Sequence, residues 1–420
     1  MSISAGPPGP GELRRHLGVS DAVLVGLGSM LGAGVFAVLA PAAAASGGGL
    51  LLGLAVAALV AYCNATSSAR LAARYPRSGG TYVYGTERLG ELWGYLAGWS
   101  FVTGKTASCA AMALTVGLYV WPGQAHAVAV ATVAVLTAVD YAGVRKAAWL
   151  TRAIVAFVLV VLAAVVVACL AGGAPPRPAP GGAAFTAAGV LQAAGLLFFA
   201  FAGYARIATL GEEVRDPRTT IPRAIPLALG LTLAVYAAVA VAVLAVLGPG
   251  RLARAAAPLA EAVRAAGVPA LVPLVQAGAA VAAAGSLLAL LLGVSRTTMA
   301  MARDRHLPHT LAAVHPRRHV PHHAQLAVGA AVAALAATLD VRGAIGFSSF
   351  GVLVYYAIAN ASAWTLSPGL TARIVPGAGL LGCLVLAFTL PSASVLWGTL
   401  VLAAGAAAYG VRKAVAARRP

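Results

Sequence analysis

The chain has 420 residues, of which 60% are hydrophobic and only 10% are charged. Because a water-soluble domain carries about 25% charged residues, this composition excludes an ordinary soluble protein and indicates an all-α membrane protein. The formal net charge is +18 at pH 7. The basic residues form short clusters between apolar segments, without the interleaved aromatic residues of a basic binding stripe, so nucleic acid is not an expected partner.

Twelve apolar segments are long enough for a membrane-spanning helix, which needs about 20 residues to cross the hydrocarbon layer. In chain order they are residues 20–45, 49–73, 93–120, 124–142, 147–171, 187–211, 224–247, 268–301, 323–340, 343–366, 374–391 and 394–411. The eighth segment is long and includes polar residues, so we expect a tilted helix there. The sequence therefore predicts a polytopic protein with 12 transmembrane helices, embedded in the lipid bilayer.

Lysine and arginine residues test this topology, because they concentrate on the cytoplasmic side of membrane proteins. With the N-terminus inside, 22 of the 29 basic residues fall on the cytoplasmic side, five fall outside and two, Lys105 and Arg206, lie within spans. One miscounted span would exchange the sides of all residues after it. We therefore predict a multi-pass protein of the cell (cytoplasmic) membrane with both termini in the cytoplasm.

The first span has four glycines near its middle: Gly26, Gly28, Gly32 and Gly34. Each costs roughly 1 kcal/mol relative to alanine inside a helix. Close helix packing needs small residues on one face, but these four occupy more than one. We interpret the segment as unwound backbone, which a membrane tolerates only where it lines a cavity. Close packing against a neighbouring helix is the alternative, and the same glycines argue against a cleaved signal peptide.

The sixth span contains a second candidate break, at Gly203 among the aromatic residues of segment 197–204. Phe199 is a candidate lid over a substrate, and an ordinary lipid-facing aromatic run is the alternative. Free amide and carbonyl groups at two such breaks could hold the carboxylate and the ammonium group of a zwitterionic amino acid. Breaks in spans 1 and 6 are also expected from two inverted five-span repeats.

Four blocks of sequence resemble the amino acid–polyamine–organocation (APC) superfamily of permeases, whose bacterial members include amino acid transporters. They are GSMLGAGVF (28–36), YPRSGGTYVY (75–84, with GELWG at 90–94 and GW at 98–99 behind it), the segment 198–225, and the segment 296–308. These blocks run in the family's order through most of residues 20–320, whereas residues 321–420 match mainly by hydropathy.

The resemblance implies a leucine-transporter-type fold, in which spans 1–5 and 6–10 form a 5+5 inverted repeat followed by two peripheral helices. The chain then divides into a cytoplasmic N-terminal tail (1–18), a first five-helix repeat (19–171), an extracytoplasmic linker (172–186), a second five-helix repeat (187–366), spans 11 and 12 (367–411) and a cytoplasmic C-terminal tail (412–420).

The resemblance also implies a substrate site at the two breaks. The implied substrate-binding residues are Met30, Gly32, Ala33, Gly34, Phe199, Ala202 and Gly203, and the gating or coupling candidates are Phe201, Tyr204, Lys105 and Arg206. The amides of Ala33 and Gly34 would bind the substrate carboxylate. The carbonyl groups of Met30, Phe199 and Ala202 would bind its amino group.

Two departures from the family pattern leave the coupling ion open. Ala205 stands where many relatives have an acidic residue, which weakens the case for cationic substrates, and span 5 lacks the lysine that replaces a sodium ion in some proton-coupled relatives. Lys105 is either a proton-linked switch or a side chain that snorkels to the inner face. Arg206 is expected to form a gate-like ion pair with Glu212 or Glu213, to snorkel or pair with another loop acid, or to contact an anionic substrate.

The sequence has no P-loop, G-x-S-x-G or H-E-x-x-H motif, so we expect neither an enzyme nor a cofactor. Six histidines between spans 8 and 9 lack a metal-ligand spacing, so no metal site is expected. We predict a secondary active amino acid transporter that works by alternating access, with a coupling proton or by exchange. The alternatives are an exporter or antiporter of amino acids or polyamines on the same fold, a sugar or drug facilitator with two six-helix halves, and a non-transporting amino acid sensor.

Overall fold

The computed structural model describes residues 17–75, 79–143, 148–172, 185–208, 214–367 and 369–417. Helices account for most of these residues, and within them a single β bridge joins Leu17 to Val214. Within these described ranges, eleven helical segments are long and apolar enough to cross a membrane. The protein is therefore an all-α polytopic membrane protein, as its composition predicts.

The first half of the chain forms α1 (Val19–Met30), α2 (Ala33–Ala37), α3 (Leu39–Ser46), α4 (Leu50–Arg74), α5 (Thr81–Leu89), α6 (Glu91–Val120), α7 (Ala125–Tyr141) and α8 (Ala148–Ala171). The second half forms α9 (Ala187–Phe201), the 3₁₀ turn η3 (Ala202–Tyr204), α10 (Ala205–Ala208), α11 (Pro217–Arg254), α12 (Pro258–Ala265), α13 (Val272–Arg303), α14 (His322–Thr338), α15 (Val341–Leu366), α16 (Leu370–Thr389) and α17 (Ser392–Ala417). Each predicted span falls on one helix or on a consecutive group of helices.

α14 is short for a membrane-spanning helix. It has 17 residues, or about 25 Å at 1.5 Å per residue, and is not among the eleven candidate spans. The count of twelve spans and the division into two inverted repeats therefore stay predictions.

α11 is longer than the seventh predicted span, residues 224–247. The helix includes Pro222 and Pro226 near its start and continues past a kink at Gly248. Gly248 has φ 65°, a left-handed conformation that glycine adopts without steric cost. The chain beyond this kink leads into α12, a short helix outside the set of candidate spans.

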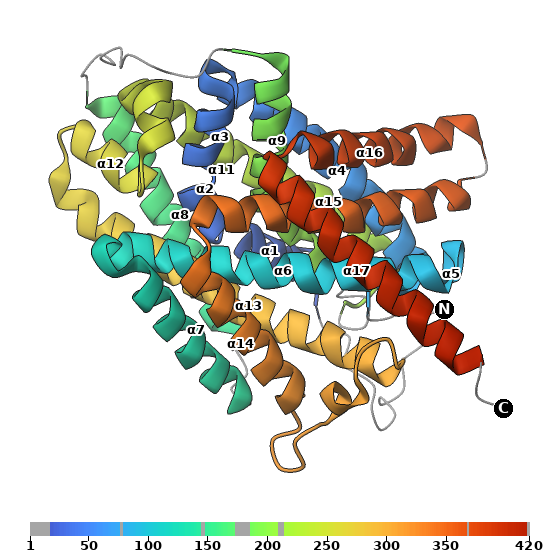
Figure 1. Cartoon of the computed structure of the whole chain (residues 1–420). Coiled ribbons are helices and arrows are strands. Elements are labelled where there is room, and N and C mark those ends of the chain that lie inside the picture. The colour runs from blue at the N-terminus through green and yellow to red at the C-terminus, as the bar shows by residue number, and fades with distance from the viewer. Residues whose placement is uncertain are drawn as a thin grey trace, which may run out of the picture.

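The helices pack around α6, which contacts α13, α15 and α7, while α4 packs against α9 and α11. α6, α15 and α16 run in similar directions across the molecule, and α7 and α14 cross them obliquely (Figure 1). α5 and the end of α17 lie at one end of the molecule, and α12 lies at the opposite end (Figure 1). The predicted topology requires this separation, because it places α5 inside and α12 outside.

Large apolar side chains lie on the outer surface as well as in the core. Trp149 is 68% exposed and Val167 is 64% exposed, whereas Phe36 and Phe198 are fully buried. Lipid tails are as apolar as these side chains, so an exposed apolar surface is stable within a bilayer. The helix faces therefore point either to lipid or to the interior that contains the candidate site.

Candidate functional site

The first predicted span is interrupted at Leu31 and Gly32, between α1 and α2. Leu31 has φ −75° and ψ 35°, and Gly32 has φ −87° and ψ −139°. Both conformations lie outside the α-helical region. A Cβ atom on Gly32 would lie 2.2 Å from Ser286 Oγ of α13, so the break also brings the backbone close to a neighbouring helix.

The other three glycines of this span pack helices together instead of unwinding them. Gly26 and Gly28 lie within α1, and Gly34 lies within α2. A Cβ atom on Gly26 would lie 2.4 Å from Ile207 Cδ1, and one on Gly34 would lie 2.7 Å from the Ala200 Cβ. Both interpretations of the glycine-rich segment therefore hold, each for different residues.

The sixth predicted span is tightened at its break and not fully unwound. α9 ends at Phe201, and the 3₁₀ turn η3 joins it to α10. A Cβ atom on Gly203 would lie 2.4 Å from the carbonyl oxygen of Ser29 and 2.8 Å from the amide nitrogen of Met30. Glycine is required here because the two breaks touch through their backbones.

Hydroxyl groups satisfy the carbonyl oxygens that the breaks release. The Tyr236 hydroxyl of α11 lies 2.6 Å from the Met30 carbonyl oxygen and 3.1 Å from that of Ala200. The Tyr356 hydroxyl donates to the Ala202 carbonyl oxygen over 3.4 Å. An unsatisfied carbonyl group costs several kcal/mol in a bilayer, so these tyrosines stabilise the breaks. Each carbonyl oxygen can accept a second hydrogen bond, which leaves capacity for a ligand.

Sequence analysis did not identify Tyr236, Tyr356 or Ser286 as parts of the site. The Ser286 hydroxyl of α13 donates to the Gly28 carbonyl oxygen over 3.3 Å. The one available signal was a buried tyrosine in the middle of a span, because its hydroxyl group needs a partner inside the membrane. That signal indicates a partner without identifying it.

A cavity of about 220 Å³ lies beside the two breaks. Its lining residues are Ser29, Gly79, Tyr82, Gly98, Phe101, Lys105, Ser108, Met112, Phe199, Ala202, Gly203, Ala205, Arg206, Ser286, Ala289, Leu290, Gly293, Arg296, Thr297 and Tyr355. Pockets for drug-sized ligands are larger, at about 300–1,000 Å³. The volume suits a small solute.

The cavity brings together five of the sequence-predicted residues: Phe199, Ala202, Gly203, Lys105 and Arg206. They come from α6, α9, η3 and α10. The cavity therefore joins both break regions to the two charges that the sequence places within spans.

The remaining candidates lie outside the lining of this cavity. Ala33 is fully buried and packs with Val116 and Ala283, in the same part of α2 as Gly34. Phe201 packs against Tyr236, with ring centroids 5.2 Å apart. Tyr204 packs against the ring of Tyr356 at 5.1 Å. Met30 and Gly32 contact other helices at the break itself.

The cavity extends from the breaks toward one end of the molecule only. Gly79 and Tyr82, next to and within α5, line it together with Arg296 and Thr297 of α13. On the other side of the break, the Tyr119 hydroxyl donates to the Phe36 carbonyl oxygen over 2.9 Å. The α12 end is thus closed, and the cavity lies toward α5.

The charges of the cavity are of one sign among the described residues. Lys105, Arg206 and Arg296 line it, and no described lining residue is acidic. The Lys105 side chain is 7% exposed and has no hydrogen bond or ion pair with the described part of the chain. Lys105 is therefore a buried residue of the cavity wall, and its role as a proton-linked switch or a snorkelling side chain stays a prediction. The partners predicted for Arg206, Glu212 and Glu213, lie outside the described residues.

A second hollow of about 670 Å³ lies between α4 and α11. Apolar residues such as Leu54 and Leu229 line it, together with Tyr62 and Gly230. Leu51, Leu59 and Tyr62 on its α4 side are exposed, which indicates a groove on the outer surface. The groove lacks charged groups and does not reach either break.

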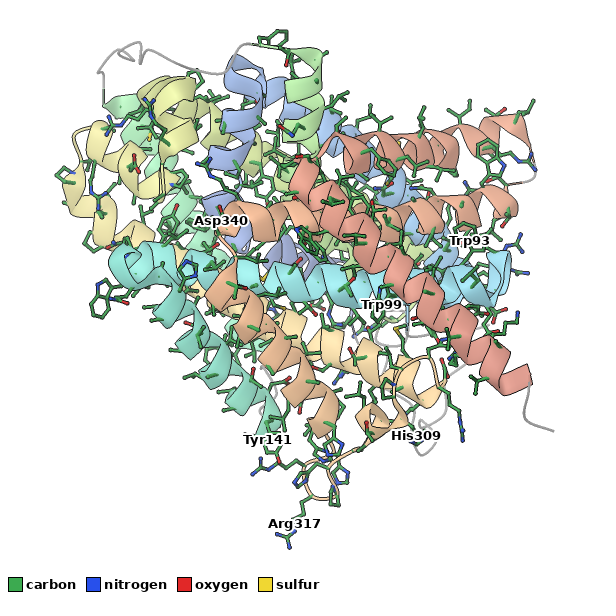
Figure 2. All side chains as sticks on the ribbon, in the orientation of Figure 1. Trp93, Trp99, Tyr141, His309, Arg317 and Asp340 are labelled. Carbon is green, nitrogen blue, oxygen red and sulfur yellow. The ribbon has the colours of Figure 1, made fainter. Side chains whose placement is uncertain are left out.

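The histidine-rich loop between α13 and α14 supplies no residue to the cavity lining, although its His306 contacts the lining residue Tyr82. His309 and Arg317 lie at the edge of the molecule (Figure 2). Within the described ranges, no three His, Cys, Asp or Glu side chains are grouped closely enough to hold a metal ion.

Comparison with known proteins connects this architecture to a family. The amino acid permease family model matches residues 21–408. An uncharacterized transporter of Mycobacterium tuberculosis H37Rv is 74% identical over 412 residues, which cover 97% of this chain and 94% of the relative. Human cationic amino acid transporter 4 is 30% identical, with 82% of this chain and 58% of the relative covered. The branched-chain amino acid permease BcaP of Bacillus subtilis is 25% identical, with 93% and 91% covered.

Proposed function

This chain belongs to the amino acid permease family and is an amino acid transporter, and on that premise we propose secondary active transport of amino acids across the cytoplasmic membrane by alternating access. The observation that carries the proposal is the direct contact of the two breaks, Gly203 against Ser29, beside a cavity of about 220 Å³. Broken helices at the centre of a membrane supply backbone groups for a small zwitterion.

In the second state of the proposed transport cycle, the side of the cavity that is closed here would open. In the present state the cavity reaches toward α5, which the predicted topology places in the cytoplasm. Ala33 is buried beneath Val116 and Ala283, and the neighbouring Gly34 is buried against Ala200 of α9. We propose that their amides bind the substrate carboxylate once this wall moves away from α2. The amino group would then be accepted by the Met30, Phe199 and Ala202 carbonyl oxygens.

Proton coupling and amino acid exchange both remain parts of the proposal, and so do export and sensing on the same scaffold. The family match argues against a sugar or drug facilitator. Counterflow in proteoliposomes of known orientation separates import from exchange. Binding without flux would identify a sensor. Uptake measured with and without an imposed pH gradient tests proton coupling.

A one-methyl substitution tests the break site directly. In Gly203→Ala the new Cβ would lie 2.4 Å from the Ser29 carbonyl oxygen, a backbone atom that cannot rotate away. We expect amino acid uptake in proteoliposomes to fall by at least about tenfold, because a misplacement of about 1 Å at a binding site has effects of that size or larger. The matched control is Gly230→Ala on α11, where the new Cβ has no atom within 4 Å. Equal uptake by both variants would overturn the proposal.

A further inference from the structure

Positively charged side chains line the cavity both beside the breaks and closer to its α5 end. Lys105 lies on the same face of α6 as Phe101, Ser108 and Met112, which all line the cavity. Arg296 lies farther along, near the end of α13. Arg206 lines the cavity too and has other interactions in the protein. No Asp or Glu lines the cavity among the described residues.

Lys105 is the informative member of this set, because it is buried. A buried ammonium group without a partner carries a large desolvation cost, which an opposite charge offsets. The described residues supply no carboxylate to Lys105, and the Ser108 hydroxyl on the same helix face is bonded to Ser348. The cavity is the space into which a partner can enter. An anion in that space would complete the interactions of Lys105.

We propose that the cavity takes amino acids with an acidic side chain, and that the Lys105 ammonium group binds the side-chain carboxylate while the two breaks hold the α-amino and α-carboxyl groups. This proposal rests on the proposed transport function and adds its substrate class.

The arginines extend this selection toward the α5 end of the cavity. A cationic amino acid would meet Arg296 and then Lys105, and like charges brought together discriminate against the wrong substrate. Arg296 also interacts electrostatically with the Asp140 carboxylate of α7, which offsets part of the arginine's positive charge. An anionic amino acid entering from this end would instead be attracted by Arg296 and Lys105.

The test compares two amino acids of nearly equal shape. L-Glutamate has a side-chain carboxylate where L-glutamine has an amide. The ratio of their KM values therefore reports the effect of this charge. Uptake of each amino acid by wild-type protein in proteoliposomes is measured, and L-leucine and L-arginine are measured in the same way. We expect L-glutamate to be taken up with a KM at least about tenfold lower than L-glutamine, the factor for a hydrogen bond between charged groups. L-Arginine should be the poorest substrate.

A charge-removing substitution then assigns the preference to one residue. Lys105→Met keeps the length and apolar stem of the side chain, and we expect it to bring the L-glutamate and L-glutamine KM values together. Lys413→Met on α17 is the matched control, because Lys413 is exposed and outside the cavity. An unchanged ratio in a folded Lys105→Met protein would overturn the role of Lys105.

Failure of this inference differs from failure of the transport proposal. Preferred uptake of L-leucine, L-arginine or L-glutamine by the wild-type protein refutes the acidic substrate class and leaves amino acid transport intact. No uptake of any of the twenty amino acids, with no counterflow, refutes both. The ratio of the wild-type KM values alone decides the substrate class. This result therefore holds even if the Lys105→Met protein does not fold.

Discussion

Tyr236 holds the two breaks together through one hydroxyl group. It lies within 3.1 Å of carbonyl oxygens on both broken spans, Met30 on α1 and Ala200 on α9. Its ring packs against Phe201 and is 3% exposed. A single hydroxyl proton can be donated to one carbonyl at a time, so small movements of the breaks would shift it between them.

Tyr236→Phe removes this hydroxyl and keeps the ring. We expect the free energy of unfolding to fall by about 1–3 kcal/mol, because buried acceptors lose their donor. The thermal midpoint in detergent, followed by tryptophan fluorescence, measures the change. Tyr62→Phe on α4 is the control, since Tyr62 is 49% exposed and such a surface change stays within about 0.5 kcal/mol. Equal midpoints for the two variants would remove the proposed role of this hydroxyl.

The position of the first break could be predicted from the sequence, but its partners could not. Glycine density locates the break because a run of glycines weakens a helix whatever surrounds it. The donor to Met30 is 206 residues away in sequence, and its arrival depends on how α11 rotates against α1. Similarly, only the packing of α6 shows that Lys105 lines the cavity.

At the scale of helices, four elements meet around His306 at the α5 end of the molecule. The groups in contact with this ring are Tyr82 of α5, Glu91 and Tyr95 of α6, and Tyr409 of α17. Asp304 accepts from Tyr82, and Arg412 of α17 bonds the Arg305 carbonyl oxygen and Glu91. His306 Nδ1 lies 2.8 Å from the Tyr82 hydroxyl, and Nε2 lies 3.1 Å from Glu91 Oε1. The ring thereby connects α5, α6 and α13.

The Tyr82 hydroxyl connects Asp304 to the His306 ring. It donates to Asp304, a carboxylate that can only accept. Burial, and then the hydrogen bond to Asp304, raise the pKa of Tyr82 well above its ordinary range, so the hydroxyl keeps its proton. The same hydroxyl lies against His306 Nδ1, and the other ring nitrogen lies against Glu91. The ring therefore joins two carboxylate-bearing segments of the chain.

The contacts of this ring predict an effect on stability. His306→Ala removes both ring contacts, and we expect the thermal midpoint in detergent to fall, because the Tyr82 hydroxyl and the Glu91 carboxylate each lose a partner. His309→Ala is the control, because His309 is exposed (Figure 2). Equal midpoints for the two variants would contradict the structural role of His306.

The sequence predicts the helices beside this cluster but not the contacts within it. Hydropathy predicts the spans on either side of α5, but α5 itself lies in a polar segment between them and is not a candidate span. The cluster joins residues more than 200 positions apart, such as Tyr82 and Asp304. No local pattern identifies such a set before the helices are packed.

For the whole molecule, composition and charge predict more than they do for the site. Apolar length and the distribution of basic residues predict the helical class and put α5 and α12 on opposite sides. They do not predict which end of the cavity is open, because both states of a transporter share one sequence and differ by only a few kcal/mol. The closed end depends on tertiary contacts, such as Tyr119 of α6 with Phe36 of α2 and the Leu259 amide of α12.

Cysteine labelling measures this asymmetry with two substitutions on opposite sides of the break. Thr297→Cys lies in the cavity wall toward α5, and Val116→Cys lies in the closed wall beside Ala33. Both changes nearly preserve side-chain volume. The four native cysteines, Cys63, Cys109, Cys169 and Cys383, are free and buried, so background labelling should be slow.

With a membrane-impermeant maleimide we expect Thr297→Cys to react from the side that carries α5, which is cytoplasmic in the predicted topology. Val116→Cys should be protected from both sides, because Val116 is 6% exposed and lies in the closed wall. A transported amino acid that drives the cycle should raise the labelling of Val116→Cys from the opposite side, since alternating access must open that wall to load or release substrate. Labelling of Val116→Cys that no amino acid changes, together with measurable uptake, would mean that substrate passes by another route than the breaks.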